Sequence, residues 1–551
     1  MQADTRILAG GVALGAIGLL IGGAFAGLIL QGAGDLSGAV AAFDPYLLRV
    51  ARFTLWQALL STVLSVVPAL FVARALSRHP DFPGRRWLIG LFAVPLGLPA
   101  IVAALGILAL LGRAGYFAGL LSIFGSGDWP GIYGISGILV AHVFFNLPLA
   151  TRLFLEALNA VPADHWRLAS QLGMGARPSF RLIEWPALRA TLPGVAGLVF
   201  MLCITSFTLV LTLGGGPRAT TLEVAIYQTL RFDFDPARAV ALTFLQIVLT
   251  VAVVALLARL GTDVTGEVNM TVTRRRFLSP GRGEAALNAT LILLATLFVV
   301  GPMAATVASG LRADLARLAM EPAVHGAVIT SLVLAFFAAL LSVALSYALT
   351  ASRRALQLRR HGGAPSLFEL LTGTGAGFVL VVPPIVVGAG WFILLRHAGD
   401  VFLFAPVMVV AVNAVMAMPF ALRAIRPAHD AASARHEKLC AQLGLSGWNR
   451  LRLVELPVLR RPLATAFAFA MALSLGDLGV IALFGSDAVQ TLPYLLFQRL
   501  GSYRTADAAG LALLLGLICL ALMLAADRLA GLGKSVPRFS DKNLRQEKIS
   551  R

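Results

Sequence analysis

The sequence predicts an all-α, polytopic membrane protein with about twelve transmembrane helices, and three observations indicate this class. Of the 551 residues, 58% are hydrophobic and only 13% are charged, whereas a soluble globular chain carries roughly a quarter charged residues. The mean hydropathy is +0.84. The apolar stretches reach about 20 residues, the length of a membrane-spanning helix rather than of a barrel strand. Helices satisfy their own backbone hydrogen bonds in lipid, so this class is favoured.

The predicted spans fall into two sets of six. The first set is expected at 7–29, 53–73, 88–112, 134–155, 193–215 and 238–258, and the second at 286–308, 326–350, 376–395, 402–422, 463–485 and 506–526. We therefore expect a first membrane domain at 1–260, a cytoplasmic linker at 261–285, a second membrane domain at 286–527 and a basic cytoplasmic tail at 528–551.

The net charge of +18 arises from 45 Lys and Arg against 27 Asp and Glu. In a membrane protein such an excess gathers in cytoplasmic loops, so it predicts topology rather than nucleic-acid binding. A cytoplasmic N-terminus places most of the basic residues on the cytoplasmic side, and both termini are then cytoplasmic. The three cysteines, Cys203, Cys440 and Cys519, form no CxxC pair. The sequence therefore predicts no disulfide framework, metal site or cofactor.

The two halves of the chain are predicted to be homologous. A shift of 271 residues aligns 166–193 with 437–464, and eleven of these 28 positions are identical. Composition alone would give roughly three or four matches. A second match, at a shift of 270, joins 221–228 to 491–498. Because each half has an even number of spans, the repeats are parallel and should be related by a pseudo-two-fold axis along the membrane normal.

The strongest similarity lies in a predicted cytoplasmic loop between the fourth and fifth spans of each half. We call residues 162–189 the first loop and residues 430–460 the second loop. Asp164 is expected to cap a helix that begins near His165, and Gly173 is expected to end it in a left-handed conformation. Four residues at helical spacing form its expected apolar face: Trp166, Leu168, Ala169 and Leu172. A second helix follows, with Pro186 near its start or at a break. Such a helix–turn–helix either lies on lipid headgroups or inserts into another protein.

These loops resemble the signature loop of ABC-importer permeases, which reads Glu-Ala-Ala, three residues, Gly, nine residues, Ile, one residue, Leu-Pro. Gly173 is followed nine residues later by Ile183-Glu184-Trp185-Pro186, and Gly444 by Val454-Glu455-Leu456-Pro457. The opening triad differs, because Arg167-Leu168-Ala169 and Lys438-Leu439-Cys440 replace Glu-Ala-Ala. The residues that the resemblance assigns to contact with an ATPase are Arg167, Ala169, Gly173, Ile183, Glu184, Pro186, Lys438, Gly444, Val454, Glu455 and Pro457.

More widely, the chain resembles the fused permeases of that family and, within it, those of thiamine importers. Similar segments include 141–148, 213–217, 225–228 and 475–479. The resemblance implies two fused type I permease domains in the bacterial inner membrane, acting as a pseudo-dimer within the lipid bilayer. It also implies two copies of a cytoplasmic ATPase, one periplasmic substrate-binding protein, and thiamine or its phosphates as the substrate. A ferric-iron importer permease is the alternative within the family.

The sequence indicates a transport subunit without catalytic residues. The nearest look-alike of a phosphate-binding loop, at 531–535, has Arg528 where the motif requires its first glycine. ATP hydrolysis is therefore expected from a separate subunit. A secondary transporter is a more distant alternative, which would require coupled ionisable residues within the bundle.

Polar residues at membrane depth are candidates for the translocation path, because burying them in lipid is costly. His142 and Asn146 lie one turn apart on the fourth span, where they either line the path or bond to neighbouring helices. Asp477 is expected inside the eleventh span, as a path residue or as a carboxylate at a helix end. Pro95 and Pro99, matched by Pro383-Pro384, are expected to break the third helix of each half.

The external face is expected where the fifth spans end. Glycine-rich turns occur there, and they are followed by the segments 221–228 and 491–498, which match between the two halves. The residues expected to receive the binding protein, or else to form ordinary external turns, are Gly214, Gly215, Gly216, Pro217, Gln228 and Gln498.

Overall fold

The computed structural model describes residues 2–34, 44–123, 129–214, 216–259, 281–360, 364–372, 382–397, 399–445, 447–487 and 489–531. The first half contains α1 (Gln2–Gly34), α3 (Pro45–Arg78), α4 (Arg85–Leu91), α5 (Val94–Gly97), α6 (Ala100–Leu111), α7 (Ala118–Ser122), α8 (Ile135–Asn159), α9 (Ala163–Gln171), α10 (Ala176–Ser179), η1 (Phe180–Glu184), α11 (Trp185–Ile204), α12 (Thr208–Leu213), η2 (Pro217–Ala219), α13 (Leu222–Gln228), η3 (Thr229–Asp233) and α14 (Pro236–Arg259).

The second half contains α15 (Arg282–Leu311), α16 (Leu315–Met320), α17 (Pro322–Arg359), α19 (Pro384–Arg396), η4 (Val401–Phe404), α20 (Ala405–Gln442), α21 (Gly447–Arg450), η5 (Leu451–Glu455), α22 (Leu456–Gly476), α23 (Gly479–Phe484), α24 (Leu492–Gly501) and α25 (Thr505–Gly531). The described part of the chain contains no strand. The prediction of an all-α chain is confirmed.

The twelve predicted spans correspond to ten long apolar helices and two shorter arrangements. The third span is a pair of helical segments, Arg85–Gly97 and Ala100–Leu111, bent by 111°. Pro99 lies at the bend, as expected from its missing amide hydrogen. The ninth span retains α19, and its predicted start at 376–381 lies outside the described residues.

The predicted linker and tail are partly helical. Residues 260–280 of the linker and 532–551 of the tail lie outside the described residues. However, α15 already begins at Arg282 and α25 continues to Gly531. The first helix of the second half therefore begins before residue 286, and its last helix ends after residue 527.

Equivalent contacts relate the two halves. α3 and α17 each begin with a proline, at Pro45 and Pro322. Nine residues further along each helix, a hydroxyl accepts a hydrogen bond from the start of a short helix. The amide of Leu222 donates to Thr54 Oγ1 (3.0 Å) and that of Leu492 to Ser331 Oγ (2.7 Å). The short helices α13 and α24 are thus tied to corresponding helices.

The first helix of each half packs on the other half. α1 lies against α17 and α19, and α15 lies against α3 and α6. Trp391 of α19 donates a hydrogen bond from Nε1 to the carbonyl oxygen of Leu20 (2.7 Å). Gly390 and Gly106, at corresponding places in α19 and α6, leave room for close approach of α1 and α15. In the folded chain, α1 therefore packs with helices of the second half, and α15 packs with helices of the first half.

The fifth span of each half is broken, and the prediction of continuous helices there was wrong. α11 gives way to α12 after Ile204, and α22 gives way to α23 after Gly476. Asp477 is therefore not in a helix interior. Its carboxylate accepts hydrogen bonds from the amides of Gly479 (3.2 Å) and Val480 (3.3 Å). An Asp that bonds to downstream amides competes with the helical pattern and starts a new helix.

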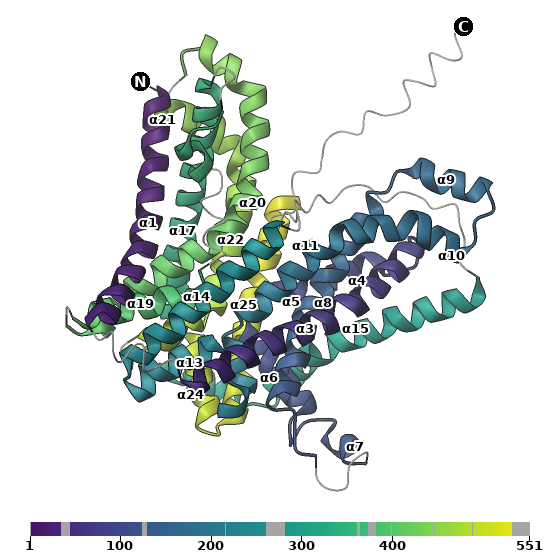
Figure 1. Ribbon diagram of the computed structural model, residues 1–551, viewed down its shortest axis with the longest axis horizontal. Helices are drawn as coiled ribbons and strands as arrows, with labels where there is room; N and C mark the ends of the chain where they lie inside the picture. Colours follow the sequence, from purple (N-terminus) through teal and green to yellow (C-terminus); the bar gives the residue numbers. More distant parts are fainter. Residues whose placement is uncertain are drawn as a thin grey trace.

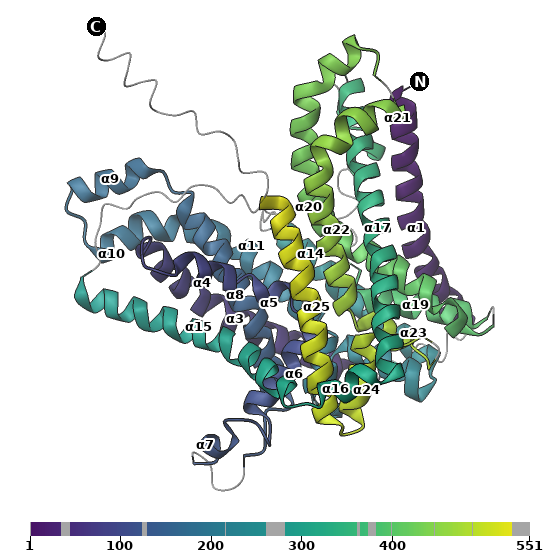
Figure 2. The same cartoon turned by 180° about the vertical axis from the view of Figure 1, so that it is seen from behind.

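Two groups of helices diverge toward one end of the molecule, one with α1, α17 and α20 and the other with α15, α3 and α8 (Figure 1). That end carries α9, α10, α21 and the start of α1, and we call it the loop end. The opposite end, which we call the far end, carries α13 and α24. α25 runs from the far end to the loop end (Figure 2). The N-terminus of α1 and the C-terminus of α25 therefore both lie on the loop side.

Candidate functional site

The first loop forms a short helix, a glycine turn and a helical return. α9 begins at Ala163 after Pro162, so Asp164 lies in the first turn and is not the cap that the sequence predicted. Asp164 instead pairs with Arg167 at 3.4 Å on the exposed surface. Gly173 follows α9 with φ +64°, which confirms the left-handed turn. η1, a π-helical turn, then leads into α11, whose first turn contains Pro186.

The second loop repeats this arrangement with one difference. α20 continues without interruption to Gln442, so the helix that precedes the turn belongs to the fourth span. Gly444 adopts φ +62°. The π-helical turn η5 spans Leu451–Glu455, at the positions that correspond to η1. π-Turns of this kind are often found at functional sites.

Each loop exposes three leucines at corresponding positions. These six side chains are between 50% and 68% exposed: Leu168, Leu172 and Leu182 in the first loop, and Leu439, Leu443 and Leu453 in the second. Trp166 and Ala169 are buried instead, so the single apolar face predicted for the first loop was wrong. The helix has one apolar face turned inward and a second turned outward, and paired outward apolar faces are typical of interaction sites.

The other predicted loop residues divide between the two faces. Arg167, Pro186 and Pro457 are exposed, and Ile183 and Val454 are half-buried. Lys438 lies in α20, and its side chain is outside the described part of the structure.

The two loop glutamates point inward. Glu184 and Glu455, the last residues of η1 and η5, are buried. Glu184 accepts hydrogen bonds from Nε of Arg74 (2.8 Å) and Nε of Arg78 (3.0 Å). A buried carboxylate requires such partners, because its desolvation is otherwise uncompensated. These glutamates therefore join the loop to the membrane helices rather than presenting a charge to a partner.

The arginines of α3 hold the first loop at three points. Arg78 also donates to the carbonyl oxygen of Ala176 (3.3 Å), and the guanidinium of Arg74 lies 5.1 Å from the centre of the Phe180 ring. In the second loop, Arg450 donates to Glu455 (3.0 Å) and to Glu437 (3.2 Å).

Tyr347 of α17 also donates to Glu455. No local sequence pattern links Arg74, Arg78 or Tyr347 to loops about one hundred residues away, so these three residues could not be predicted as part of the site.

The predicted path residues lie in separate places. His142 Nδ1 is 2.8 Å from Ser61 Oγ, and Asn146 Nδ2 donates to Cys203 Sγ (3.3 Å). Both contacts join helices within the first half. Asp477 lies at the break in the fifth helix of the second half.

The two fifth-helix breaks meet residues of the opposite half. A Cβ placed on Gly476 would lie 3.1 Å from Pro99, at the bend of the third span. One placed on Gly479 would lie 3.9 Å from Phe207. Interrupted helices leave backbone groups free for other partners, and they are tolerated where they line a cavity or pack in protein.

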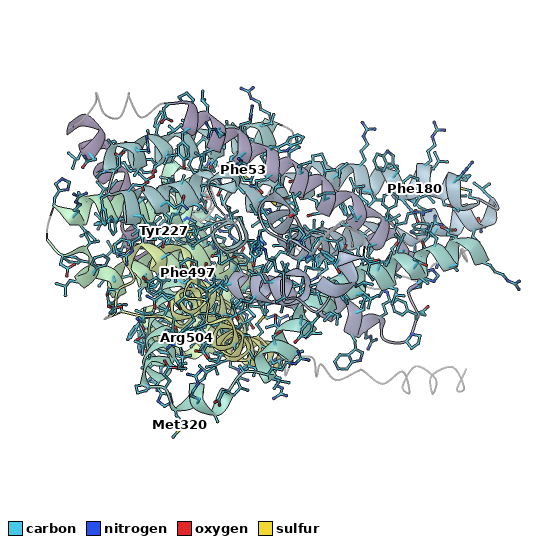
Figure 3. The ribbon with its side chains drawn as sticks, turned by 90° about the horizontal axis from the view of Figure 1, so that it is seen from below. Phe53, Phe180, Tyr227, Met320, Phe497 and Arg504 are labelled. Carbon is cyan, nitrogen blue, oxygen red and sulfur yellow. The ribbon has the colours of Figure 1, made fainter. Side chains whose placement is uncertain are left out.

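At the far end, the predicted turn residues are only partly visible. Gly214 ends α12 and Gly216 adopts φ +130°, whereas Gly215 and the side chain of Pro217 lie outside the described residues. Gln228 and Gln498 are half-buried in α13 and α24. Figure 3 views this end and labels Tyr227 of α13 and Phe497 of α24, which belong to one hydrophobic cluster. Arg231 joins the halves here by donating to the carbonyl oxygen of Gly485 (2.9 Å).

Two exposed aromatic residues at the far end have unusual backbone conformations. Phe234 (φ +52°) and Tyr503 (φ +61°) are the non-glycine residues with positive φ among those described. Each precedes the last helix of its half by two residues and is at least 71% exposed. Bulky residues in this region are strained, and such strain clusters at functional sites.

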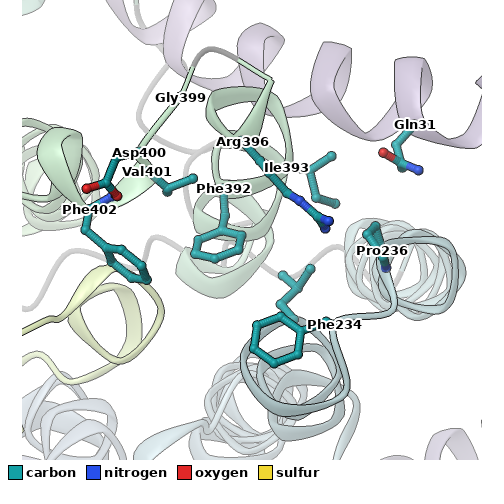
Figure 4. Close-up of a pocket in the computed structure, with 11 residues that line it drawn as sticks. Gln31, Phe234, Pro236, Phe392, Ile393, Arg396, Gly399, Asp400, Val401 and Phe402 are labelled. Carbon is teal, nitrogen blue, oxygen red and sulfur yellow. The ribbon is translucent and has the colours of Figure 1, made fainter.

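A cavity of about 280 Å³ lies beside Phe234. Phe392 and Phe402 line it together with Arg396 and Gln31 (Figure 4). The cavity therefore lies between the end of α1, the start of α14 and the turn after α19.

Glu223 is a buried acidic residue that was not among the predicted site residues. It lies in α13, is 1% exposed, and its Oε1 has no hydrogen-bond partner. Burial raises the pKa of its carboxyl to about 8. Its counterpart in the second half is Pro493. The sequence signal was an isolated acid within the apolar segment 222–227.

The described residues contain no group of three or more His, Cys, Asp or Glu side chains that could hold a metal ion. Cys203, Cys440 and Cys519 are free thiols, and all three are buried.

Comparison with known proteins identifies the family. The family described as the binding-protein-dependent transport system inner membrane component matches residues 65–266 and 371–533. The thiamine transport system permease protein of Brucella abortus is 58% identical over 526 residues, which are 96% of each chain. Its counterpart in Salmonella typhimurium is 45% identical over 489 residues, 89% of this chain and 90% of the relative.

A sulfate transport system permease protein of Salmonella typhimurium is 28% identical over 229 residues. These residues are 81% of that protein but 40% of this chain, which fits a chain built from two permease units. With one copy of the family domain matched in each half, this chain belongs to the binding-protein-dependent transport system inner membrane components.

Proposed function

We propose that this chain is the membrane-spanning subunit of an ATP-driven ABC importer that moves thiamine and its phosphates into the cytoplasm. Relatives named as thiamine transport permeases match nearly the whole chain, at up to 58% identity in the comparisons above. The observation that carries the transport mechanism is the matched pair of loops, each with three outward leucines on the helical segments around its glycine turn.

The leucine surfaces are the docking points for two copies of a cytoplasmic ATPase. Each surface presents apolar side chains on a helix whose other face is buried in the protein, so the surface is preorganised for a partner. Because the two surfaces are equivalent, they fit two copies of one subunit. ATP is hydrolysed by that subunit and not by this chain.

The loop end faces the cytoplasm and the far end faces the periplasm. The outer termini of α1 and α25 both lie on the loop side, and the distribution of Lys and Arg favours a cytoplasmic position for that side. Both termini of the chain are then cytoplasmic.

One periplasmic substrate-binding protein docks at the far end, across the junction of the two halves. Phe234 and Tyr503 provide one exposed aromatic anchor on each half, and each follows Gln228 or Gln498 by a few residues in the chain. Periplasmic binding proteins close two lobes around their ligand, so two anchors match two lobes of a single partner.

Substrate crosses between the two halves, which rock about the pseudo-two-fold axis. The two broken fifth helices and the bent third span meet at their contact, where Gly476 lies against Pro99. ATP binding and release move the loops and thereby alternate the access of this region.

The test is uptake of labelled thiamine by cells that lack this gene, with the chain restored or absent. Restored uptake that requires both the ATPase and the binding protein supports the proposal. Insertion of the chain without thiamine uptake would move the substrate to another solute, with ferric iron the first to assay. Uptake without any ATPase would favour a secondary transporter.

A further inference from the structure

The two first helices, α1 and α15, start at the loop end and cross to the opposite half. Their crossings correspond, because α1 lies on α17 and α19 while α15 lies on the equivalent helices α3 and α6. The close approaches also correspond. A Cβ on Gly390 would lie 2.2 Å from the backbone of Ala24, and a Cβ on Gly106 would lie 2.3 Å from that of Pro302.

At its loop end, α1 reaches the glutamate of the second loop. Arg6, in the second turn of α1, forms an ion pair with Glu455. Arg6 and Glu455 are 19% and 6% exposed at their side chains, so water screens this pair only partly. A helix of the first half, α1, therefore supplies one of the residues that bind Glu455 in the second loop.

At its loop end, α15 reaches the network of the first loop. Glu284, in the first turn of α15, forms an ion pair with Arg78 and lies 3.3 Å from Nη2 of Arg74. These are the two arginines that hold Glu184. The second-half helix thus contributes the charge that balances two guanidiniums around one loop carboxylate.

The two networks make the same connection with opposite charges. In each network, a charged residue in the first two turns of α1 or α15 contacts the loop of the opposite half. Arg6 pairs with Glu455 directly, and Glu284 pairs with the arginines that hold Glu184. Truncating a partner in a buried pair leaves an uncompensated charge. Moving a loop away from the helix that crosses to it would break these ion pairs and cost free energy. Moving the loop and the helix together would keep them.

We propose that Arg6 and Glu284 are positioning residues that tie each ATPase-docking loop to the first helix of the opposite half. Movement of either loop is then carried into both halves, so that ATP-driven closure acts on the pseudo-dimer as one unit. This inference rests on the proposed function, since it assumes that ATPase subunits act on the two loops.

The experiment uses the complete importer, with its ATPase and binding protein, in proteoliposomes. The variants are Arg6→Gln, Glu284→Gln and the double variant, with Arg282→Gln as the control, because Arg282 lies exposed in the same turn as Glu284. Uptake of labelled thiamine and ATP hydrolysis are measured together, which gives the ATP consumed per molecule imported.

Each single variant should lower uptake about fivefold, and the double variant about tenfold or more, while ATP hydrolysis is retained. The ATP consumed per imported molecule therefore rises. Arg6→Lys and Glu284→Asp keep the charges and should recover most of the coupling. Unchanged uptake in the double variant, or a parallel loss of uptake and assembled complex at a constant ratio, would overturn the proposal.

A second measurement does not depend on the substrate. Spin labels at the exposed positions Ala289 of α15 and Arg181 of the first loop report the separation of helix and loop. In the wild-type complex this separation should stay constant when nucleotide binds, and in Glu284→Gln it should change. A separation that changes equally in both proteins would show that Glu284 does not tie them together. If the spin labels behave as expected but the wild-type complex imports no thiamine, only the proposed substrate would be rejected.

Discussion

The first and second loops reach the same arrangement by different local structures. Pro162 separates α8 from α9, so the first loop begins as an independent helix. The corresponding residue is Ser433, and α20 passes through it as one 38-residue helix. Arg74 and Arg78 of α3 hold Glu184 from outside the first loop, whereas Arg450 holds Glu455 from within the second.

This difference shows which features the shared architecture requires. The left-handed glycine, the π-turn, the inward glutamate and the outward leucines are common to both loops. The residues that surround the glutamates are not. The position of the buried carboxylate therefore matters more than the source of its partners, since any donor that compensates its charge serves.

Replacing both Gly173 and Gly444 with Pro should have the largest effect. Proline requires φ near −65°, but these residues have φ +64° and +62°, so the turn cannot form. Thiamine uptake should be lost while the protein still inserts, as judged by its amount in membranes. Loss from only one of the two single variants would show that the loops are not equivalent, and normal uptake in the double variant would exclude them as coupling elements.

Replacing the glutamates tests the difference between the networks. Glu184→Ala leaves the half-buried Arg74 and Arg78 of α3 with only Glu284 as a carboxylate partner, and should cost about 3–5 kcal/mol of stability. Glu455→Ala should cost a comparable amount, because Arg450 keeps its contact with Glu437 but Arg6 and Tyr347 lose theirs with Glu455. Thermal unfolding in nanodiscs measures both, with the exposed Arg282→Gln as the control. A negligible cost in either variant would contradict the described role of that glutamate.

Glu223, which has Pro493 as its counterpart, should make stability depend on pH. The pKa of its carboxyl is raised to about 8 in the folded protein, against about 4.3 in an unfolded chain. Below both values the carboxyl is protonated in each state and has no effect. As pH rises between them the unfolded state ionises first, so stability falls and the full loss is present above about pH 8.

The Glu223→Gln variant should therefore be more stable than wild type at pH 9, by about 5 kcal/mol, and nearly equal to it at pH 4. The corresponding change in the second half, Pro493→Gln, serves as a control without a carboxyl to titrate. An equal difference between wild type and Glu223→Gln at the two pH values would show that this carboxyl ionises normally.

The smallest effects are expected from the outward leucines. Leu172→Ser and the equivalent Leu443→Ser should each weaken association with the ATPase by about 1–2 kcal/mol. Binding of the detergent-solubilised chain to the purified ATPase measures this loss, and folding stability should be unchanged because both side chains are exposed. Equal losses would confirm two equivalent docking surfaces, whereas no loss in either would place the ATPase contact elsewhere.

Much of the site could be predicted where it depends on local pattern. The glycines at 173 and 444 end their helices as expected, because a left-handed conformation favours a residue without a side chain. The bend at Pro99 follows from the missing amide. By contrast, Asp164 was a poor guide to the start of α9, since Pro162 and a first-turn acid serve there without a side-chain cap.

The sequence alone determined the membrane class, the duplication and the paired loops, because hydropathy, repeat spacing and turn residues act over short stretches of chain. Only the tertiary structure decided that α1 and α15 cross between the halves, that the fifth helices break, and that Glu184 and Glu455 face inward. These features depend on contacts between residues far apart in the chain, such as Arg6 with Glu455. A buried charge takes its partner from whichever helix packing brings near it, and no local sequence pattern records that neighbour.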